Sequence, residues 1–309
     1  MKSQTPALHL VQPEDLPRGI SAVRALPNEA LDALWESIVV ADEIKERLLS
    51  QALLNFALRP KVSRDQVPMH GVILLVGPPG TGKTSLARGL GSKLASFMVK
   101  ANPRLVEVDP HALTSSAMGK TQRAVSELFS QTIAEQASNG PTIVLLDEVE
   151  TLAADRSRMS LEANPVDIHR ATDAVLVQLD ALAEQHPNIL FVATSNFPQA
   201  IDDAFTSRCD LVIDVPPPGH DAVAEILKQC LTGLAKQFPA LDSIANAQDI
   251  TKIARACEGL DGRAIRKMVV NAMAMRREVA VDPNKLATAD LLAAAKDAKS
   301  ARARREASK

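Results

Sequence analysis

Aromatic side chains are scarce in this sequence of 309 residues, which has seven Phe, one Trp and no Tyr. Proteins that read single-stranded nucleic acid stack its bases on aromatic side chains, so this composition argues against such a fold. We expect instead a core of aliphatic residues and alanine. The 35 Lys and Arg nearly balance the 37 Asp and Glu, for a net charge of -2. Such a chain has no general electrostatic attraction to nucleic acid or to an anionic membrane.

Cysteines and long apolar runs are also rare. The three cysteines, Cys209, Cys230 and Cys257, are odd in number and widely spaced, which is typical of a reducing compartment. The six histidines are scattered without metal-ligand spacing, so we expect no zinc site. The longest apolar runs, such as 72–76, hold about five residues, whereas a membrane span needs about 20. With no apolar signal core at the N-terminus, we expect a cytoplasmic protein.

The spacing of apolar residues predicts an α/β domain followed by a helical one. Residues 1–29 contain four prolines and no periodic pattern, so we expect an extended N-terminal arm. Apolar residues at helical spacing then surround a short break: Leu31, Leu34, Ile38, Ile44, Leu48 and Leu49. From these patterns we place the large domain at 30–218, a helical lid at 219–295 and a basic tail, or frayed helix, at 296–309.

Five short apolar runs indicate buried strands of a parallel sheet. They alternate with stretches long enough for crossover helices, for example 83–98, 124–136 and 171–185, and this alternation is typical of a sheet covered on both faces. The triplet Pro216–Pro218 ends the last strand, and no convincing strand follows it. The expected strands are Val72–Val76, Leu105–Val108, Ile143–Leu146, Ile189–Ala193 and Leu211–Val215.

A glycine-rich loop stands between the first of these strands and the helix that follows. Its glycines let successive backbone N–H groups turn toward phosphate oxygens at the positive end of that helix. Lys83 would reach the β- and γ-phosphates of ATP, and the Thr84 hydroxyl would ligate Mg²⁺. The residues expected to bind the nucleotide here are Gly77, Pro78, Pro79, Gly80, Thr81, Gly82, Lys83, Thr84 and Ser85.

Two further strands end in polar residues suited to hydrolysis. The strand 143–146 runs directly into Asp147 and Glu148. Asp147 suits Mg²⁺, as a ligand or through a bound water, and Glu148 can polarise an attacking water. Asn196 follows the strand at 189–194 and could hold that water through its amide, although an Asn after a strand is often only a turn residue.

Two arginines are candidates for contact with an anion. Arg208 precedes the last strand, and Arg263 lies two residues after Asp261, which can cap a helix. The apolar face of that helix would be Ile265, Met268, Val269, Ala272 and Met273. A cation in the first turn of a helix opposes the helix dipole, so a nearby anion would explain Arg263. A surface salt bridge is the alternative for either residue.

Together these features resemble the AAA+ ATPases, over residues 31 to about 280. Several segments look more narrowly like the pachytene-checkpoint family, which remodels HORMA-domain proteins: Trp35–Val39, Asp147–Leu152, Asn164–Asp167, Ala174–Asp180 and Leu260–Lys267. The short stretch before the ATPase resembles the compact bacterial members associated with cyclic-oligonucleotide antiphage defence.

The resemblance implies a sheet of order 5-1-4-3-2, a hexameric ring, and ATP bound between subunits. It matches Asn196 to the sensor-1 position, Arg263 to the lid arginine, and Arg208 to the finger that reaches the neighbour's γ-phosphate. Ile38 and Val39 match the segment beside adenine. The first pore loop corresponds to residues 114–120, with Ala117, Met118 and Gly119 where the family usually has an aromatic.

The function that these features favour is ATP-driven remodelling of a HORMA-domain protein. The resemblance suggests a partner that is bound to a nucleotidyltransferase, and an off-switch for defence signalling. General protein unfolding, a nucleic-acid motor or loader, and a nucleotide-gated scaffold are the alternatives. The near-neutral charge and few aromatics count against the motor. A binding switch needs no polarising carboxylate, so the scaffold is disfavoured by the joint presence of Lys83, Glu148, Asn196, Arg208 and Arg263.

Overall fold

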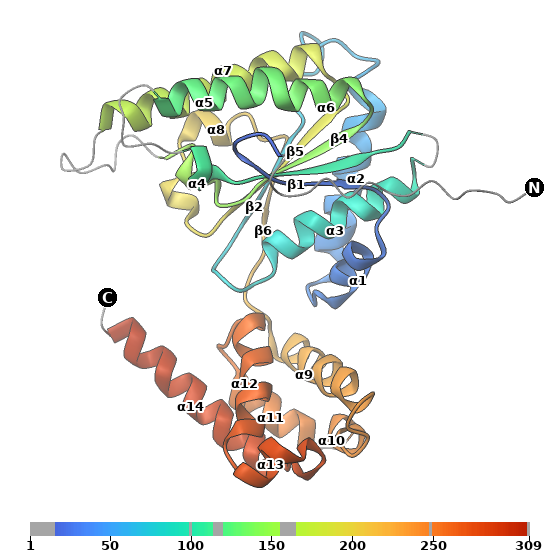
Figure 1. The fold of residues 1–309 in the computed structure, drawn as a ribbon, viewed down its shortest axis with the longest axis vertical. Coiled ribbons are helices and arrows are strands. Elements are labelled where there is room, and N and C mark those ends of the chain that lie inside the picture. Colours follow the sequence, from blue (N-terminus) through green and yellow to red (C-terminus); the bar gives the residue numbers. More distant parts are fainter. Residues whose placement is uncertain (1–15, 99–100, 114–119, 155–164, 247–248, 308–309) are drawn as a thin grey trace, which may run out of the picture. The chain divides into compact units, whose positions relative to one another are not determined.

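The computed structural model describes residues 16–98, 101–113, 120–154, 165–246 and 249–307 (Figure 1). Its strands are β1 (Ile20–Ala25), β2 (Val72–Val76), β3 (Arg104–Val108), β4 (Thr142–Leu146), β5 (Ile189–Ser195) and β6 (Leu211–Asp214). The helices up to β6 are α1 (Glu29–Ser37), α2 (Asp42–Leu58), α3 (Lys83–Ser96), α4 (Pro110–Leu113), α5 (Lys120–Glu127), the π-helix η2 (Leu128–Ile133), α6 (Ala134–Ser138), α7 (Pro165–Gln185) and α8 (Asp203–Thr206), with 3-10 turns η3 (Val149–Thr151) and η5 (Pro198–Ala200).

The chain after β6 is helical throughout the part that is described. It forms α9 (His220–Ala235), α10 (Leu241–Ala245), α11 (Asp249–Cys257), α12 (Gly262–Ala274), α13 (Arg277–Val281), the 3-10 turn η6 (Pro283–Lys285) and α14 (Thr288–Ala307). The prediction of a helical region after the proline triplet is confirmed. Of the two forms expected for residues 296–309, the helical one is found as far as Ala307.

The six strands form one sheet of order β1-β3-β4-β5-β2-β6. The five strands predicted from apolar runs are all present, with bounds within two residues of the expected ones. Numbered among themselves, they also have the expected order 5-1-4-3-2. The alternation of buried strands with helices therefore predicts this architecture correctly.

The sixth strand, β1, corrects the prediction of a five-stranded parallel sheet. It pairs antiparallel with β3 at the sheet edge, where Ile20 lies opposite Val108 and Ala25 opposite Arg104. We expected no strand before residue 30, so the prediction of an extended arm is wrong for residues 20–25. An edge strand buries only part of its side chains, and the burial of β1 shows no strict alternation that a sequence pattern would reveal.

The chain divides into two compact units, which we treat separately. One holds residues 1–32, 47–75 and 87–213, and the other holds 33–46, 76–86 and 214–309. In the first, α5, α6 and α7 lie along one face of the sheet and α2 and α3 along the other (Figure 1). Every residue of β2, β4 and β5 is buried, as continuous apolar strands require.

The second unit has its own apolar core, built from the helices after β6. Buried side chains from α9, α11, α12 and α14 contribute to it, among them Leu231, Ile253, Met268 and Leu291. Both units have mostly aliphatic and alanine cores, as the composition predicts. Within the described ranges, no helix is both long and apolar enough to span a membrane.

Candidate functional site

The glycine-rich loop lies in the second unit, between Val76 and the start of α3 at Lys83. Gly77, Gly80 and Gly82 all have positive φ, so the loop folds through conformations that residues with a side chain avoid. Lys83 is 5% exposed, and its ammonium donates hydrogen bonds to the Gly77 and Pro78 carbonyls at 2.8 Å each. The loop thus combines a buried cation with the N-terminus of a long helix, an arrangement that fits a phosphate group.

The N-terminus of α12 lies directly against this loop in the same unit. Asp261 caps α12 by accepting the Ala264 N–H at 2.9 Å, as the sequence predicts. A Cβ added to Gly80 would stand 2.1 Å from Asp261 Oδ1, so only glycine allows this close approach. The Arg263 N–H donates to the Gly80 carbonyl at 3.4 Å, and the Arg263 side chain is exposed.

Ile38 and Val39, the segment expected beside adenine, lie in this unit as well. A Cβ on Gly82 would be 3.1 Å from two carbon atoms of Ile38, so the Ile38 side chain packs against the loop backbone. Val39 packs against the apolar core formed by the helices after β6. The second unit therefore brings together the loop, the adenine-side segment and the start of α12.

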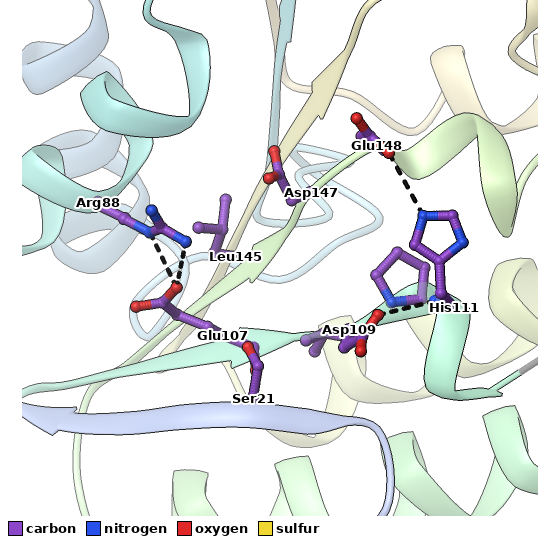
Figure 2. Close-up of a pocket in the computed structure, with 10 residues that line it drawn as sticks. Ser21, Arg88, Glu107, Asp109, His111, Leu145, Asp147 and Glu148 are labelled. Carbon is purple, nitrogen blue, oxygen red and sulfur yellow. Dashed lines mark hydrogen bonds and ion pairs between the residues drawn. The ribbon is translucent and has the colours of Figure 1, made fainter.

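The carboxylate pair at the end of β4 lies in the first unit (Figure 2). The Thr194 hydroxyl donates to Asp147 Oδ1 at 2.5 Å, and the hydroxyl oxygen of Thr194 accepts the Glu148 N–H at 3.2 Å. Thr194 is buried at the end of β5, the neighbour of β4 in the sheet. This hydroxyl fixes both carboxylate residues against the adjacent strand, a role that sequence analysis did not assign to it.

Glu148 is held in an uncommon backbone conformation and between two polar partners. Its φ of 52° and ψ of 53° lie in the left-handed region, which is strained for a residue with a side chain. Its Oε1 accepts from Asn196 Nδ2 at 3.4 Å, and its Oε2 lies 3.4 Å from His111 Nε2. The structure therefore brings Asp147, Glu148 and Asn196 together, with about half of the Glu148 side chain open to solvent.

A cleft of about 190 Å³ opens beside these carboxylates (Figure 2). Glu107 lines one side of it and is nearly buried, with ion pairs to Arg88 at 2.8 Å and to Arg24 of β1 at 2.9 Å. His111 and Glu148 line the other side. The cleft therefore leaves room for a small molecule beside the Glu148 carboxylate.

Arg208 forms a bidentate ion pair inside the first unit. Its Nε and Nη2 donate to the two carboxylate oxygens of Asp180 at 3.0 and 2.7 Å, and Nη1 donates to the Ala204 carbonyl. The hydrogen bond from Arg208 to Asp180 raises the pKa of Arg208, which keeps the guanidinium charged. Burial alone would raise the pKa of Asp180, but its bond to Arg208 brings that pKa below the ordinary value.

The expected site residues therefore fall into three groups. The loop, Ile38, Val39 and Arg263 belong to the second unit, whereas Asp147, Glu148 and Asn196 form a cluster in the first. Arg208 is bonded to Asp180 and not to that cluster, an intramolecular partner that the sequence did not reveal. Thr194 and His111 were also missed, and only the position of Thr194 at the end of a buried strand could have signalled it. The predicted pore-loop residues Ala117, Met118 and Gly119 lie outside the described residues.

Comparison with known proteins assigns the family. The model of the ATPase family associated with various cellular activities (AAA) matches residues 73–217. The chain is 63% identical over 287 residues to CD-NTase-associated protein 6 of Pseudomonas aeruginosa, covering 93% of this chain and 94% of that protein. It is 34% identical to the pachytene checkpoint protein 2 homolog of Arabidopsis thaliana, over 79% of this chain, and spans 59% of that longer protein.

Solved structures agree with this assignment. C. elegans PCH-2 superimposes with a TM-score of 0.73 at 27% identity, over 93% of this chain and 76% of that one. A chain of the E. coli MS115-1 HORMA:CdnC:Trip13 complex has the same fold, with a TM-score of 0.74 at 19% identity, over 89% and 94%. The chain therefore belongs to the AAA ATPase family, in the group that contains CD-NTase-associated protein 6 and the pachytene checkpoint protein 2 homologs.

Proposed function

We propose that this chain hydrolyses ATP with Mg²⁺ and uses the free energy to remodel a HORMA-domain protein in a CD-NTase-associated antiphage system. The 63% identity to CD-NTase-associated protein 6, across 94% of its length, carries this proposal. The likeness to pachytene checkpoint protein 2 homologs supports it, because the family that the sequence resembles remodels HORMA-domain proteins. A chain of the same fold occurs in a complex with a HORMA protein and CdnC.

The nucleotide would be held by the residues of the second unit. Backbone N–H groups from Gly80 to Ser85 donate to the phosphates, since Pro78 and Pro79 have no N–H. The Lys83 ammonium exchanges its two loop carbonyls for phosphate oxygens. Ile38 and Val39 provide apolar contact beside adenine. The residue types fit this ligand, since Gly77, Gly80 and Gly82 let the loop adopt positive φ at positions where a Cβ would also crowd a neighbouring group.

Hydrolysis would depend on the polar cluster of the first unit. Glu148 orients and polarises the attacking water, and Asn196 holds the carboxylate and the water in line. Hydroxyl and carboxylate oxygens are the ligands that Mg²⁺ prefers, so Thr84 and Asp147 are the residues that would hold the ion, which supplies charge neutralisation at the phosphates. Arg263, and Arg208 from a neighbouring subunit, would stabilise the charge that develops on the γ-phosphate.

Remodelling would follow from assembly of the chain into a hexameric ring. The segment with Ala117, Met118 and Gly119 would grip a terminal segment of the HORMA protein and pull it into the pore. A HORMA domain closes a C-terminal belt over a bound peptide, so removal of one edge strand from its sheet would loosen the belt without unfolding the whole domain. Disassembly of an activating HORMA complex would make the ATPase a negative regulator of the defence signal.

The test is release of a fluorescent peptide from a closed HORMA–peptide complex, followed by anisotropy with this chain and ATP. We expect ATP-dependent release by the wild-type chain and little release by Glu148→Gln. Glu127→Gln is the matched control, because Glu127 is an exposed carboxylate whose partner is Arg123 of the same helix. Equal release by wild type and Glu148→Gln would contradict the proposal. ATPase activity that DNA stimulates, with no peptide release, would favour the nucleic-acid motor.

A further inference from the structure

Arg266 makes one contact that joins segments far apart in the chain. Its Nη2 donates to the Ser37 carbonyl at 2.7 Å, across a sequence separation of 229 residues. Ser37 is the last residue of α1, so its carbonyl is one of the groups that a helix leaves without an internal donor. A half-buried guanidinium at the C-terminal end of a helix dipole is a favourable pairing.

The two residues after Ser37 are those expected beside adenine. Ile38 packs against the loop at Gly82, and Val39 against the apolar core of the helices after β6. The Ser37 carbonyl, which Arg266 holds by a hydrogen bond, thus directly precedes the segment expected beside adenine. Its position determines where that segment stands relative to the phosphate loop.

The same helix also contacts the phosphate loop itself. At its N-terminus, the Arg263 N–H donates to the Gly80 carbonyl, and Asp261 lies against Gly80. Arg266 follows Arg263 by three residues, about one turn of α12, so the two stand on neighbouring parts of one helix face. Helix α12 therefore contacts the loop at its start and, one turn later, the residue that directly precedes the adenine-side segment.

We infer that Arg266 is a positioning residue for the nucleotide: by holding the Ser37 carbonyl, it keeps Ile38 and Val39 in register with the phosphate loop. Its contribution goes to recognition of the base, whereas the phosphates are held by the loop and Lys83. The inference rests on the proposed nucleotide function. The planar guanidinium suits this role because it is always charged and reaches the carbonyl with a fixed geometry.

The test compares the binding of ADP and of inorganic tripolyphosphate by calorimetry. Tripolyphosphate makes the loop contacts but has no base. Removal of the bond in Arg266→Ala should weaken ADP binding about tenfold, which corresponds to about 1.4 kcal/mol, and should change tripolyphosphate binding less than twofold. Arg266→Lys keeps the cation but has a shorter reach, so its affinity for ADP should lie between those of the wild-type chain and Arg266→Ala. Lys267→Ala, which removes the next and exposed cation of α12, is the control and should bind both as wild type does.

Each other result overturns the inference. Unchanged ADP binding in Arg266→Ala would show that the bond does not position the segment. An equal loss of ADP and tripolyphosphate would show a general effect on the loop. If Arg266→Ala fails to fold, Arg266→Lys is judged by the same ratio of the two affinities. A wild-type chain that binds neither probe would refute the proposed function, and this outcome is distinct because it appears before any variant is made.

Discussion

At the scale of single residues, the backbone and the polar neighbours of Glu148 hold its carboxylate in a defined position. Its backbone lies in the left-handed region, and its carboxylate stands between Asn196 and His111. Strained backbone of this kind costs about 1–3 kcal/mol and is concentrated at functional sites. The Thr194 hydroxyl, which bonds to Asp147 and to the Glu148 N–H, holds the strained residue in place.

Replacement of Glu148 by glutamine should separate nucleotide binding from hydrolysis. The amide has nearly the same shape but cannot polarise a water, so we expect unchanged nucleotide affinity and a fall in kcat of about 100-fold or more. Steady-state phosphate release and calorimetric binding of ATP measure the two quantities. Undiminished turnover would exclude Glu148 as the catalytic carboxylate.

The residues proposed for the site could be selected from the sequence because phosphate chemistry requires a local pattern. The loop at 77–85 and the acidic pair at 147–148 each lie in one short stretch of sequence. The partners of these residues could not be predicted in the same way. Arg208 meets Asp180 across 28 residues, and His111 meets Glu148 across 37, so both contacts depend on how the chain folds.

At the scale of elements, burial decides which strands a sequence reveals. The continuous apolar runs of β2, β4 and β5 are visible because both faces of these strands are covered. Strand β1 lies at the edge of the sheet and carries mixed side chains, so it was missed. Its attachment depends partly on charge, since Arg24 of β1 and Arg88 of α3 both bind the buried Glu107 of β3.

Loss of the Glu107 carboxylate should therefore loosen β1 before it affects the rest of the sheet. In Glu107→Gln the two arginines lose a charged acceptor, and we expect a loss of about 2 kcal/mol in the free energy of unfolding. Limited trypsin digestion should cut sooner at Arg24, because the edge strand detaches more often. Glu127→Gln is again the control. An unchanged cleavage rate at Arg24 would show that backbone pairing alone holds β1.

The ion pair between Arg276, just before α13, and Asp290 of α14 should make the helical region sensitive to acid. Asp290 binds the Arg276 guanidinium through two bonds of 2.7 Å, and these, aided by the Ala287 N–H, hold the pKa of Asp290 below its ordinary 3.8. A carboxyl with a depressed folded pKa stabilises fully above its unfolded pKa, and this contribution is lost as the pH falls through the folded value.

Asp290→Asn should accordingly lower the midpoint of thermal unfolding at pH 7 and flatten its dependence on pH below about 3.8. The wild-type chain and the variant should converge at the acid end, where the wild-type carboxyl is also neutral. Circular dichroism melts across this pH range measure the difference. A constant difference between the two chains at every pH would exclude the linkage with Asp290.

At the scale of the whole molecule, Arg208 has a partner within the chain and a second one expected in a neighbouring subunit. Its guanidinium is bonded to Asp180 within the chain, yet the family resemblance assigns it to the γ-phosphate of a neighbour. Both can hold if assembly of the ring releases the guanidinium from Asp180. A bidentate pair that is partly exposed can exchange partners at modest cost, because water stabilises the freed carboxylate.

Mixed rings distinguish action in the neighbour from action within one subunit. Arg208→Ala keeps an intact phosphate loop, and Lys83→Ala keeps an intact Arg208, so each should be inactive alone. In a random equimolar ring, a loop-competent subunit meets an intact Arg208 at roughly a quarter of the interfaces. We therefore expect roughly a quarter of wild-type phosphate release. The double variant Lys83→Ala/Arg208→Ala is the matched control. Mixed with Arg208→Ala, it supplies no intact Arg208 and should restore no phosphate release. Absence of rescue in rings shown to be mixed would place Arg208 at work in its own subunit, where Asp180 already holds it.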